Sequence, residues 1–254
     1  MVNLLPLEKD ERVNAVLPVR EYSADLYVFF STRKGIVKKT PLKAYSNQRA
    51  NGIWAINLDE DDELVNVEIT RGDSEVMLFS SSGKCIRFAE KNVSSVGRTA
   101  RGVKGIRLQK DQQVVSMLVL GDGDILTVTE RGFGKRTNPV EHSCQGRGGQ
   151  GVIGIQTSER NGRLISALQV TDDDDIMLIS DGGTLVRTHA NEISTLGRNT
   201  QGVTLIRLDA DENLVGLARI QKEDEESSGA EDLTEVSGEE DPTEVSGEES
   251  VADD

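Results

Sequence analysis

The sequence predicts an all-β, propeller-like fold of four-stranded blades, with about four complete repeats and part of a preceding one. Three observations support this prediction. A unit of about fifty residues recurs along the chain, each unit carries several short apolar runs separated by polar turns, and no helical periodicity lies between them. One such unit cannot bury both faces of its own sheet, so the units are expected to stack against one another.

Each unit opens with a predicted β-hairpin. An apolar run leads to a polar turn that contains glycine, and a second run ends on a basic residue. The four copies are LYVFFSTRKGIVKKT (26–40), EVMLFSSSGKCIRF (75–88), DILTVTERGFGKRT (124–137) and DIMLISDGGTLVRT (175–188). Their turn glycines are Gly35, Gly83, Gly132 and Gly183, at spacings of 48, 49 and 51 residues. This regular spacing indicates an internal repeat and not four unrelated hairpins.

A glycine loop, an acidic turn and a final apolar strand complete each unit. The loops are NQRANGIWAINL (47–58), GRTARGVKGIRL (97–108), GRGGQGVIGIQT (146–157) and GRNTQGVTLIRL (197–208). The final strands are LVNVEI (64–69), VVSMLVL (114–120), LISALQV (164–170) and LVGLARI (214–220). The repeats are therefore predicted to span about 25–73, 74–122, 123–173 and 174–220. Residues 1–24 match only the second half of a unit and are interpreted as the C-terminal half of a truncated upstream blade.

The C-terminal segment 221–254 has a different composition. It holds 15 acidic residues and one lysine, and it contains a near-exact duplication, DLTEVSGEE followed by DPTEVSGEE. Of the 44 acids and 29 bases in the whole chain, 29 acids and 28 bases remain in residues 1–220. The body is therefore almost neutral. A segment this acidic and this poor in large apolar residues is predicted to be a disordered acidic tail.

Several classes of protein are disfavoured by the sequence. It has neither a run of about 18 apolar residues nor a basic, apolar leader, so the prediction is a cytoplasmic protein without a membrane span. Cys85 and Cys144 are too few for a disulfide framework. Together with the two histidines they lack the paired spacing of a metal site, so no metal is predicted. No catalytic constellation stands out.

The stretch QGRGGQG (145–151) resembles a phosphate-binding loop only superficially. A Walker A loop needs Lys-Ser/Thr and a following helix, and a dinucleotide fingerprint also needs that helix. Here a strand pattern begins at Val152. The plain interpretation is a tight turn in which Gly148, Gly149 and Gly151 permit positive φ. A functional alternative stays open, because small glycines would let backbone N–H groups approach phosphates.

Basic residues recur at equivalent positions of the repeats, and stacked blades would place them around one rim. Such a rim fits the phosphates of a bent duplex, and the scarcity of aromatic residues argues against single-strand stacking. In the alternative interpretation these side chains pack along the sheets or pair with nearby acids. Weighing the two interpretations, we expect about half of the named bases to contact the ligand. The candidate DNA-binding residues are Lys38, Lys39, Arg49, Lys84, Arg87, Arg98, Arg101, Lys104, Arg131, Lys135, Arg136, Arg147, Arg187 and Arg198.

The hairpin pattern GxxxKR(T), the loop pattern [QG]xRxxxG and the stretches VNLLPLEKDERV, GFGKRT, GRNTQGVTLIRL and DENLVGLARI resemble the C-terminal domain of DNA gyrase A. The resemblance covers about residues 2–220. It implies a β-pinwheel, a propeller-like disc whose outer rim binds and wraps duplex DNA. It also implies partners: the rest of gyrase A, together with gyrase B, in an A2B2 holoenzyme that introduces negative supercoils.

The sequence departs from this family in two ways. The family's box, resembling Q-R-R-G-G-K-G, stands in the first blade, whereas the comparable stretch here is the degenerate loop Gln145, Arg147, Gly148, Gly149 and Gly151 in the third repeat. The strand-passage core and its catalytic tyrosine are expected upstream of Met1. The resemblance therefore implies a chain that is non-catalytic alone and holds no cofactor, with ATP and Mg²⁺ bound elsewhere in the holoenzyme.

Two other functions remain as alternatives. The first is the equivalent C-terminal domain of topoisomerase IV, which is similar but more degenerate. The second is a protein-binding propeller whose basic columns pair internally, an interpretation that the near-neutral body favours. The acidic tail is hypothesised to compete with DNA for the basic rim, and the alternative is a tail that only keeps the protein soluble.

Overall fold

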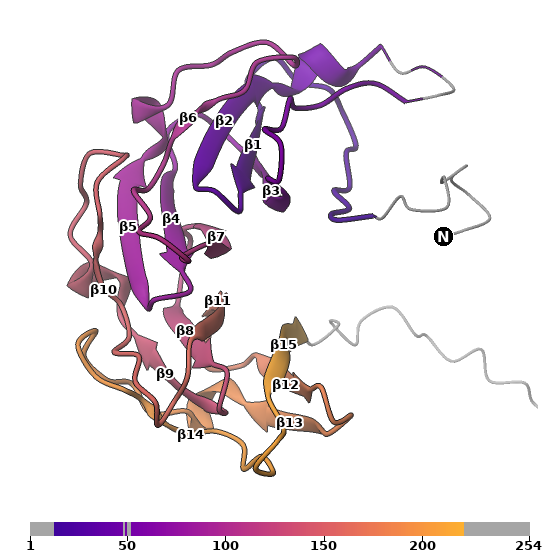
Figure 1. Cartoon of the computed structure of the whole chain (residues 1–254). Coiled ribbons are helices and arrows are strands. Elements are labelled where there is room, and N and C mark those ends of the chain that lie inside the picture. The colour runs from indigo at the N-terminus through magenta and orange to yellow at the C-terminus, as the bar shows by residue number, and fades with distance from the viewer. Residues whose placement is uncertain (1–12, 48, 50–51, 221–254) are drawn as a thin grey trace, which may run out of the picture. The chain divides into compact units, whose positions relative to one another are not determined.

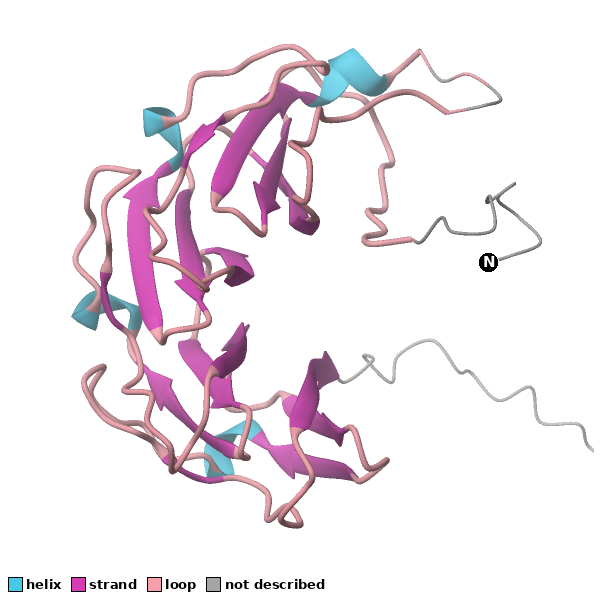
Figure 2. Cartoon of the chain, viewed as in Figure 1, coloured by secondary structure: helices cyan, strands magenta, loops and turns pink. Residues whose placement is uncertain are grey.

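The computed structural model describes residues 13–47, 49 and 52–220. The first half of the predicted upstream fragment, residues 1–12, and the whole predicted tail 221–254 lie outside these residues. The predicted all-β fold is confirmed, with four antiparallel sheets and short 3₁₀ turns between them (Figure 2). No helix among the described residues is long and apolar enough to cross a membrane.

The four predicted hairpins form the centre of each sheet. They consist of β1 (Tyr27–Thr32) with β2 (Ile36–Pro41), β4 (Glu75–Ser80) with β5 (Lys84–Ala89), β8 (Asp124–Thr129) with β9 (Phe133–Thr137), and β12 (Asp175–Ser180) with β13 (Leu185–His189). Each second strand leads into a 3₁₀ helix: η1 (Leu42–Tyr45), η2 (Glu90–Asn92), η3 (Pro139–Glu141) and η4 (Ala190–Glu192).

The long final strand of each repeat pairs with the first strand of its hairpin. These strands are β3 (Leu64–Thr70), β7 (Val114–Val119), β11 (Leu164–Val170) and β15 (Leu214–Ile220). Successive members of this set contact one another, β3 with β7, β7 with β11 and β11 with β15. They form what we call the inner edge of the sheets (Figure 1).

The fourth strand of a sheet comes from the following repeat. The two-residue strands β6 (Val103–Lys104), β10 (Val152–Ile153) and β14 (Val203–Thr204) pair with β2, β5 and β9 of the preceding repeat. We call this side of the sheets the outer edge. The sheet orders are β3-β1-β2-β6, β7-β4-β5-β10, β11-β8-β9-β14 and β15-β12-β13.

The expectation of a four-stranded blade in every repeat is therefore wrong for the last sheet, which has three strands among the described residues. The physical reason is the sharing of strands, since β13 would need a donor strand from a further repeat. The exposure of Leu185 on β13 shows the effect of the fourth strand that this sheet lacks among the described residues. Its side chain is 59% exposed, whereas Cys85 at the equivalent position of β5 is fully buried beneath Val152 of β10.

The core lies between the stacked sheets, which explains why the first hairpin strands are continuous apolar runs. On β4, Val76 and Leu78 pack toward the preceding sheet, whereas Met77 and Phe79 pack toward the following one. Successive strand residues point to opposite faces, so a strand buried on both sides needs apolar residues at every position.

Candidate nucleic-acid interface

Three arginines of the glycine loops occupy equivalent places at the outer edge. Each donates from Nη1 to a backbone carbonyl of the preceding repeat: Arg98 to Trp54 at 3.2 Å, Arg147 to Lys104 at 3.1 Å and Arg198 to Ile153 at 3.1 Å. Lys104 and Ile153 are the second residues of the short outer strands β6 and β10. Trp54 occupies the equivalent position of the first repeat. We call Arg98, Arg147 and Arg198 the arginine ladder. One guanidinium per repeat is thereby held across the joint between two repeats.

The guanidinium groups of the ladder arginines are not paired with carboxylates, although the backbone N–H of Arg198 donates to Glu141 Oε2 at 2.8 Å. None of the three forms an ion pair within the part of the chain that the structure describes. Arg147 is exposed and also donates from Nε to the carbonyl of Asn92 at 2.8 Å. Because a carbonyl bears only a partial charge, each guanidinium keeps its full positive charge available to a ligand.

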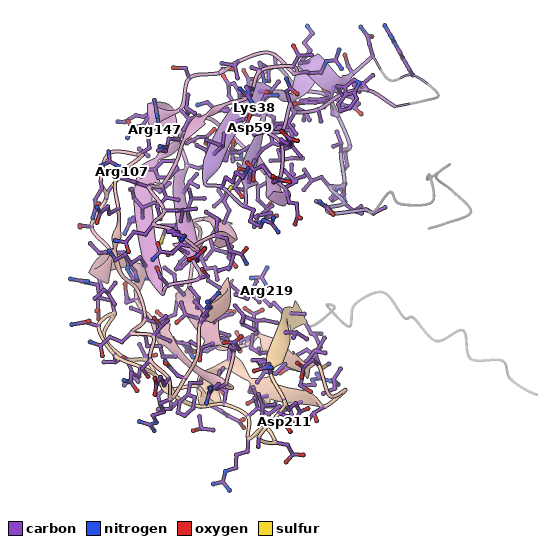
Figure 3. The ribbon with its side chains drawn as sticks, in the orientation of Figure 1. Lys38, Asp59, Arg107, Arg147, Asp211 and Arg219 are labelled. Atoms are coloured by element: carbon purple, nitrogen blue, oxygen red, sulfur yellow. The ribbon has the colours of Figure 1, made fainter. Side chains whose placement is uncertain are left out.

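Two exposed bases of the second repeat lie close to Arg147 of the third repeat. Lys104 and Arg107 are exposed beside Arg147, and the backbone N–H of Arg107 donates to the carbonyl of Gly149 at 2.7 Å. Figure 3 shows Arg107 and Arg147 outside β5, at a distance from Arg219 near the inner edge. Neither Lys104 nor Arg107 forms an ion pair among the described residues. This arrangement suits phosphate binding.

The glycine loop is explained by the close approach of two chains. Gly151 has a φ of +71°, and a Cβ added there would lie 2.2 Å from the carbonyl oxygen of Cys85 on β5. Glycine is therefore required where the chain enters the short strand β10. The backbone N–H of Gly148 is already used, since it donates to the carbonyl of Gly105 at 2.6 Å. The turn interpretation accounts for both glycines without a phosphate.

The basic column on the second hairpin strands has a structural role, and the assignment of its buried members Lys39 and Arg136 to DNA contact is wrong. Each member interacts with the residue twelve positions earlier. The Nε atoms of Arg87, Arg136 and Arg187 donate to Glu75 at 3.1 Å, Asp124 at 3.2 Å and Asp175 at 2.9 Å. Lys39 has Tyr27 at that position, with its Nζ 5.1 Å from the ring centroid, and it pairs instead with buried Glu90.

The same column also joins consecutive repeats. Lys39, Arg87 and Arg136 donate to the carbonyl of the first residue in the next 3₁₀ helix, namely Glu90 at 3.3 Å, Pro139 at 2.7 Å and Ala190 at 2.9 Å. Lys39 and Arg136 are buried and cannot meet a duplex on the surface. Arg187 has no such carbonyl within the described chain, and its side chain is 59% exposed.

Lys38 and Lys135 are fully buried, so their assignment to a DNA-binding rim is also wrong. Lys135 donates to the carbonyls of Gly197 at 2.5 Å and Arg198 at 2.7 Å, and Lys38 donates to those of Ala55 at 2.8 Å and Arg98. Burial lowers the pKa of both ammonium groups to about 8. Both lysines hold the backbone of a glycine loop, including the carbonyl of a ladder arginine.

The other candidates differ in exposure and pairing. Arg49 and Arg131 are exposed, and Lys84 is half-buried at the start of β5. Arg101 is exposed but forms an ion pair with Asp59, so its charge is partly compensated. These four positions are not brought into one cluster by any contact of the described residues.

The sequence interpretation missed one recurrent position that carries an exposed base in two repeats. Arg107 and Arg207 stand at equivalent positions five residues after the loop glycines Gly102 and Gly202. The signal was the recurrence of arginine in GIRL and LIRL. The pairing of the hairpin bases could also have been predicted from the sequence. An acidic residue begins each of the last three hairpins twelve residues before the arginine: Glu75, Asp124 and Asp175.

The groups that could serve nucleophilic chemistry have structural roles. Cys85 Sγ lies 3.3 Å from His142 Nδ1, both residues are buried, and burial raises the pKa of the thiol to about 12. The Tyr45 hydroxyl donates to the carbonyl of Ala55 at 3.1 Å, and burial raises its pKa. A nucleophile needs the opposite shift.

Stacked four-stranded sheets that exchange their outer strands, with free bases at the outer edge, define a propeller-type repeat domain with a candidate polyanion-binding surface. The family model of the DNA gyrase C-terminal domain, a β-propeller, matches residues 26–71, 74–120, 123–171 and 174–221. The chain belongs to this family.

Curated relatives and solved structures agree with this assignment. The chain is 54% identical over 229 residues to the A subunit of DNA gyrase from Salmonella typhimurium and 57% identical over 207 residues to that from Pseudomonas aeruginosa. These matches cover 89% and 81% of the chain but only 26% and 22% of the relatives. The chain therefore spans about a quarter of the length of the curated relatives it matches.

Two solved domains share the fold. The C-terminal domain of DNA topoisomerase IV aligns with a TM-score of 0.81 at 28% identity, covering 87% of this chain and 69% of that one. A DNA gyrase A C-terminal domain aligns with a TM-score of 0.77 at 25% identity, covering 86% and 74%.

Proposed function

We propose that the chain binds duplex DNA along the outer edge of its sheets through phosphate contacts, and that this binding wraps the duplex. The arginine ladder is the observation that carries the proposal. Arg98, Arg147 and Arg198 recur once in each of the last three repeats, their backbone anchors are equivalent, and none of their guanidinium groups forms an ion pair among the described residues. A regular series of cations on a rigid edge suits the repeating phosphates of a bent duplex.

The contacts expected here are largely independent of base sequence. Guanidinium and ammonium groups that meet phosphates fix the path of the duplex but do not read base edges. Lys104 and Arg107 would extend the phosphate track beside Arg147. The proposed ligand is therefore a length of duplex and not a defined operator.

The role within a larger enzyme follows from the family. The chain would act as the C-terminal part of a DNA gyrase A in the cytoplasm, together with the rest of gyrase A and with gyrase B in an A2B2 assembly. Its wrapping would support ATP-dependent negative supercoiling by the whole enzyme. The chain alone would be non-catalytic, with ATP and Mg²⁺ bound by other parts of the assembly.

DNA binding measured against salt tests the proposal directly. Fluorescence anisotropy of a labelled linear duplex, titrated with the chain at several salt concentrations, should give a linear plot of log K against log salt. The expected slope is about −0.9 for each phosphate neutralised. Relaxation of closed circles in the presence of the chain would then report wrapping. Absence of binding at low salt would contradict the proposal.

Internal pairing of the hairpin bases gives the protein-binding alternative a specific basis. Arg87, Arg136 and Arg187 are committed to carboxylates, which leaves fewer free cations than the sequence suggests. That alternative predicts no dependence of DNA affinity on salt, so the same titration separates the two functions. The topoisomerase IV alternative shares the DNA ligand and is less favoured, because the relatives matched at more than half identity are gyrase proteins.

The acidic segment 221–254 remains a candidate competitor for the outer edge. Its 15 acids are opposite in charge to the unpaired bases of the body, which is the motive for the hypothesis. A chain ending at residue 220 should then bind the duplex more tightly at low salt, and the difference should shrink at high salt. Equal affinities at every salt concentration would contradict competition.

A further inference from the structure

Trp54 is the single tryptophan of the chain, and 79% of its surface is exposed. It stands two residues after Gly52, where the first repeat carries the counterpart of the short outer strands. A large aromatic ring that stays in water forgoes the free energy its burial would release. Exposure of this residue therefore needs a reason.

The lack of a paired strand at Trp54 in the described part of the chain does not explain its exposure. The residues equivalent to Trp54 in the other repeats are Lys104, Ile153 and Thr204, which are the second residues of β6, β10 and β14. All three are exposed although their strands are paired. Successive residues of a strand point to opposite sides, so this position faces outward in every repeat. Pairing with a neighbouring sheet would therefore leave the Trp54 ring in solvent.

The backbone beneath the ring is held firmly. Arg98 Nη1 donates to the carbonyl of Trp54 at 3.2 Å. The carbonyl of the next residue, Ala55, accepts from Lys38 Nζ at 2.8 Å and from the Tyr45 hydroxyl at 3.1 Å. Three side chains thus hold the backbone that carries the exposed ring, and a held backbone loses less entropy when the residue binds.

The surroundings of the ring suit nucleic acid. The guanidinium of Arg98, a member of the arginine ladder, lies against the Trp54 backbone. A hollow of about 230 Å³ beside the ring is lined by Trp54, Ile56, Asn57 and Thr99, so no charged side chain lines it. An apolar ring next to a phosphate-binding cation can reach the bases once the backbone of the duplex is held.

We infer that Trp54 is an apolar wedge that stacks on the bases of the bound duplex and promotes its bending; this rests on the proposed function. Proteins that bend DNA insert apolar side chains between base steps, where partial unstacking kinks the duplex. Flexible pyrimidine–purine steps yield at the lowest cost, so the wedge should favour them. The wedge would add base contact at one point to an otherwise phosphate-based surface.

The single tryptophan allows a direct test on the unaltered chain. A labelled duplex is titrated with the full chain while anisotropy reports binding and tryptophan emission reports the ring. Stacking should quench the emission, shift it to shorter wavelength and protect it from acrylamide, with the same midpoint as the anisotropy. Binding seen by anisotropy with unchanged emission and unchanged acrylamide quenching would overturn the wedge and leave the proposed function standing.

Substitution then separates stacking from electrostatics. Trp54→Ala should weaken binding by about 5- to 150-fold, the range expected for one aromatic–base stack, without changing the salt slope. It should also reduce the bend measured by energy transfer between labelled duplex ends, and Trp54→Phe should retain most of both. Thr204→Ala, at the equivalent outward position, serves as the matched control. Equal affinity and bend in Trp54→Ala and the wild type would contradict the inference.

Discussion

Arg136 Nη2 lies 3.0 Å from Oδ2 of Asp124, and the two residues belong to the paired strands of one hairpin, twelve positions apart. The same arginine donates from Nη1 to the carbonyl of Ala190 in the following repeat at 2.9 Å. One side chain therefore closes its own hairpin and attaches the next repeat. Arg187 repeats the first interaction with Asp175 but has no carbonyl of a further repeat among the described residues.

Removal of the Arg136 guanidinium should destabilise the fold substantially. Its side chain is only 10% exposed, so Arg136→Met leaves the Asp124 carboxylate in a poorly solvated place without its ion-pair partner, with only the Thr195 hydroxyl among the described residues still donating to it. Breaking a buried pair in this way costs on the order of 3 kcal/mol. Urea unfolding measures the free-energy change. Arg187→Met is the matched control: it removes the same hairpin pair but no bond to a further repeat among the described residues, and Asp175 keeps His189 as a second contact, so a smaller loss is expected. Equal losses in the two variants would contradict the inter-repeat role.

Acid should weaken the fold through His142. Burial, with Lys135, Arg198 and Arg87 nearby, lowers the pKa of this imidazole from 6.5 to about 4, although Glu141 opposes the shift. Between these values the unfolded chain binds a proton that the folded chain does not, so stability falls as the pH drops from about 6.5 to 4.

The titration of His142 lowers the free energy of unfolding by at most about 3 kcal/mol between these pH values. Unfolding by urea at pH 7 and at pH 4.5 measures it. His142→Asn, which cannot titrate, should remove most of the difference between the two pH values. If the stability of the wild type and of the variant depended on pH in the same way, the loss of stability in acid would come from groups other than His142.

The arginine ladder should determine the salt dependence of DNA binding. Substitution of Arg98, Arg147 or Arg198 by alanine should lower the salt slope by about 0.9 for each phosphate interaction that the substitution removes. Affinity should fall by a similar factor for unrelated duplex sequences, because phosphate contacts do not read bases. Arg219→Ala is the control, since Arg219 lies on the inner-edge strand β15 beside Asp174 (Figure 3). A slope that changes equally in the control would disprove the assignment.

The edge of β13 that has no partner strand among the described residues should promote self-association. Leu185 is exposed there, whereas its counterparts Val37 and Cys85 are fully buried by the short strands β6 and β10. An open strand edge with an exposed apolar side chain invites pairing with another chain. Leu185→Lys should therefore reduce light scattering at high concentration without lowering the melting temperature. Cys85→Lys, at the buried equivalent, should unfold the protein, and unchanged scattering in Leu185→Lys would contradict the role of the edge.

Repetition explains why so much of the fold could be predicted. The four hairpins, the inner strands and the all-β class followed from apolar runs and turn glycines that recur at nearly constant spacing, each copy supporting the others. The two-residue strands β6, β10 and β14 could not be assigned to a sheet from the sequence. They pair with the preceding repeat, and two residues carry no pattern that indicates which strand they pair with.

The sequence by itself determined the repeat, the blades buried on both faces, the acidic segment and the set of recurrent bases. Only the tertiary structure decided which bases are available. Lys135 and Arg136 are adjacent in a basic run, yet both are buried, one against loop carbonyls and the other against Asp124. Arg147 was one base among many, but its contact with the Lys104 carbonyl leaves it exposed at the outer edge. Charge is a property of a residue, whereas its availability depends on the acids and carbonyls that folding brings within hydrogen-bonding distance.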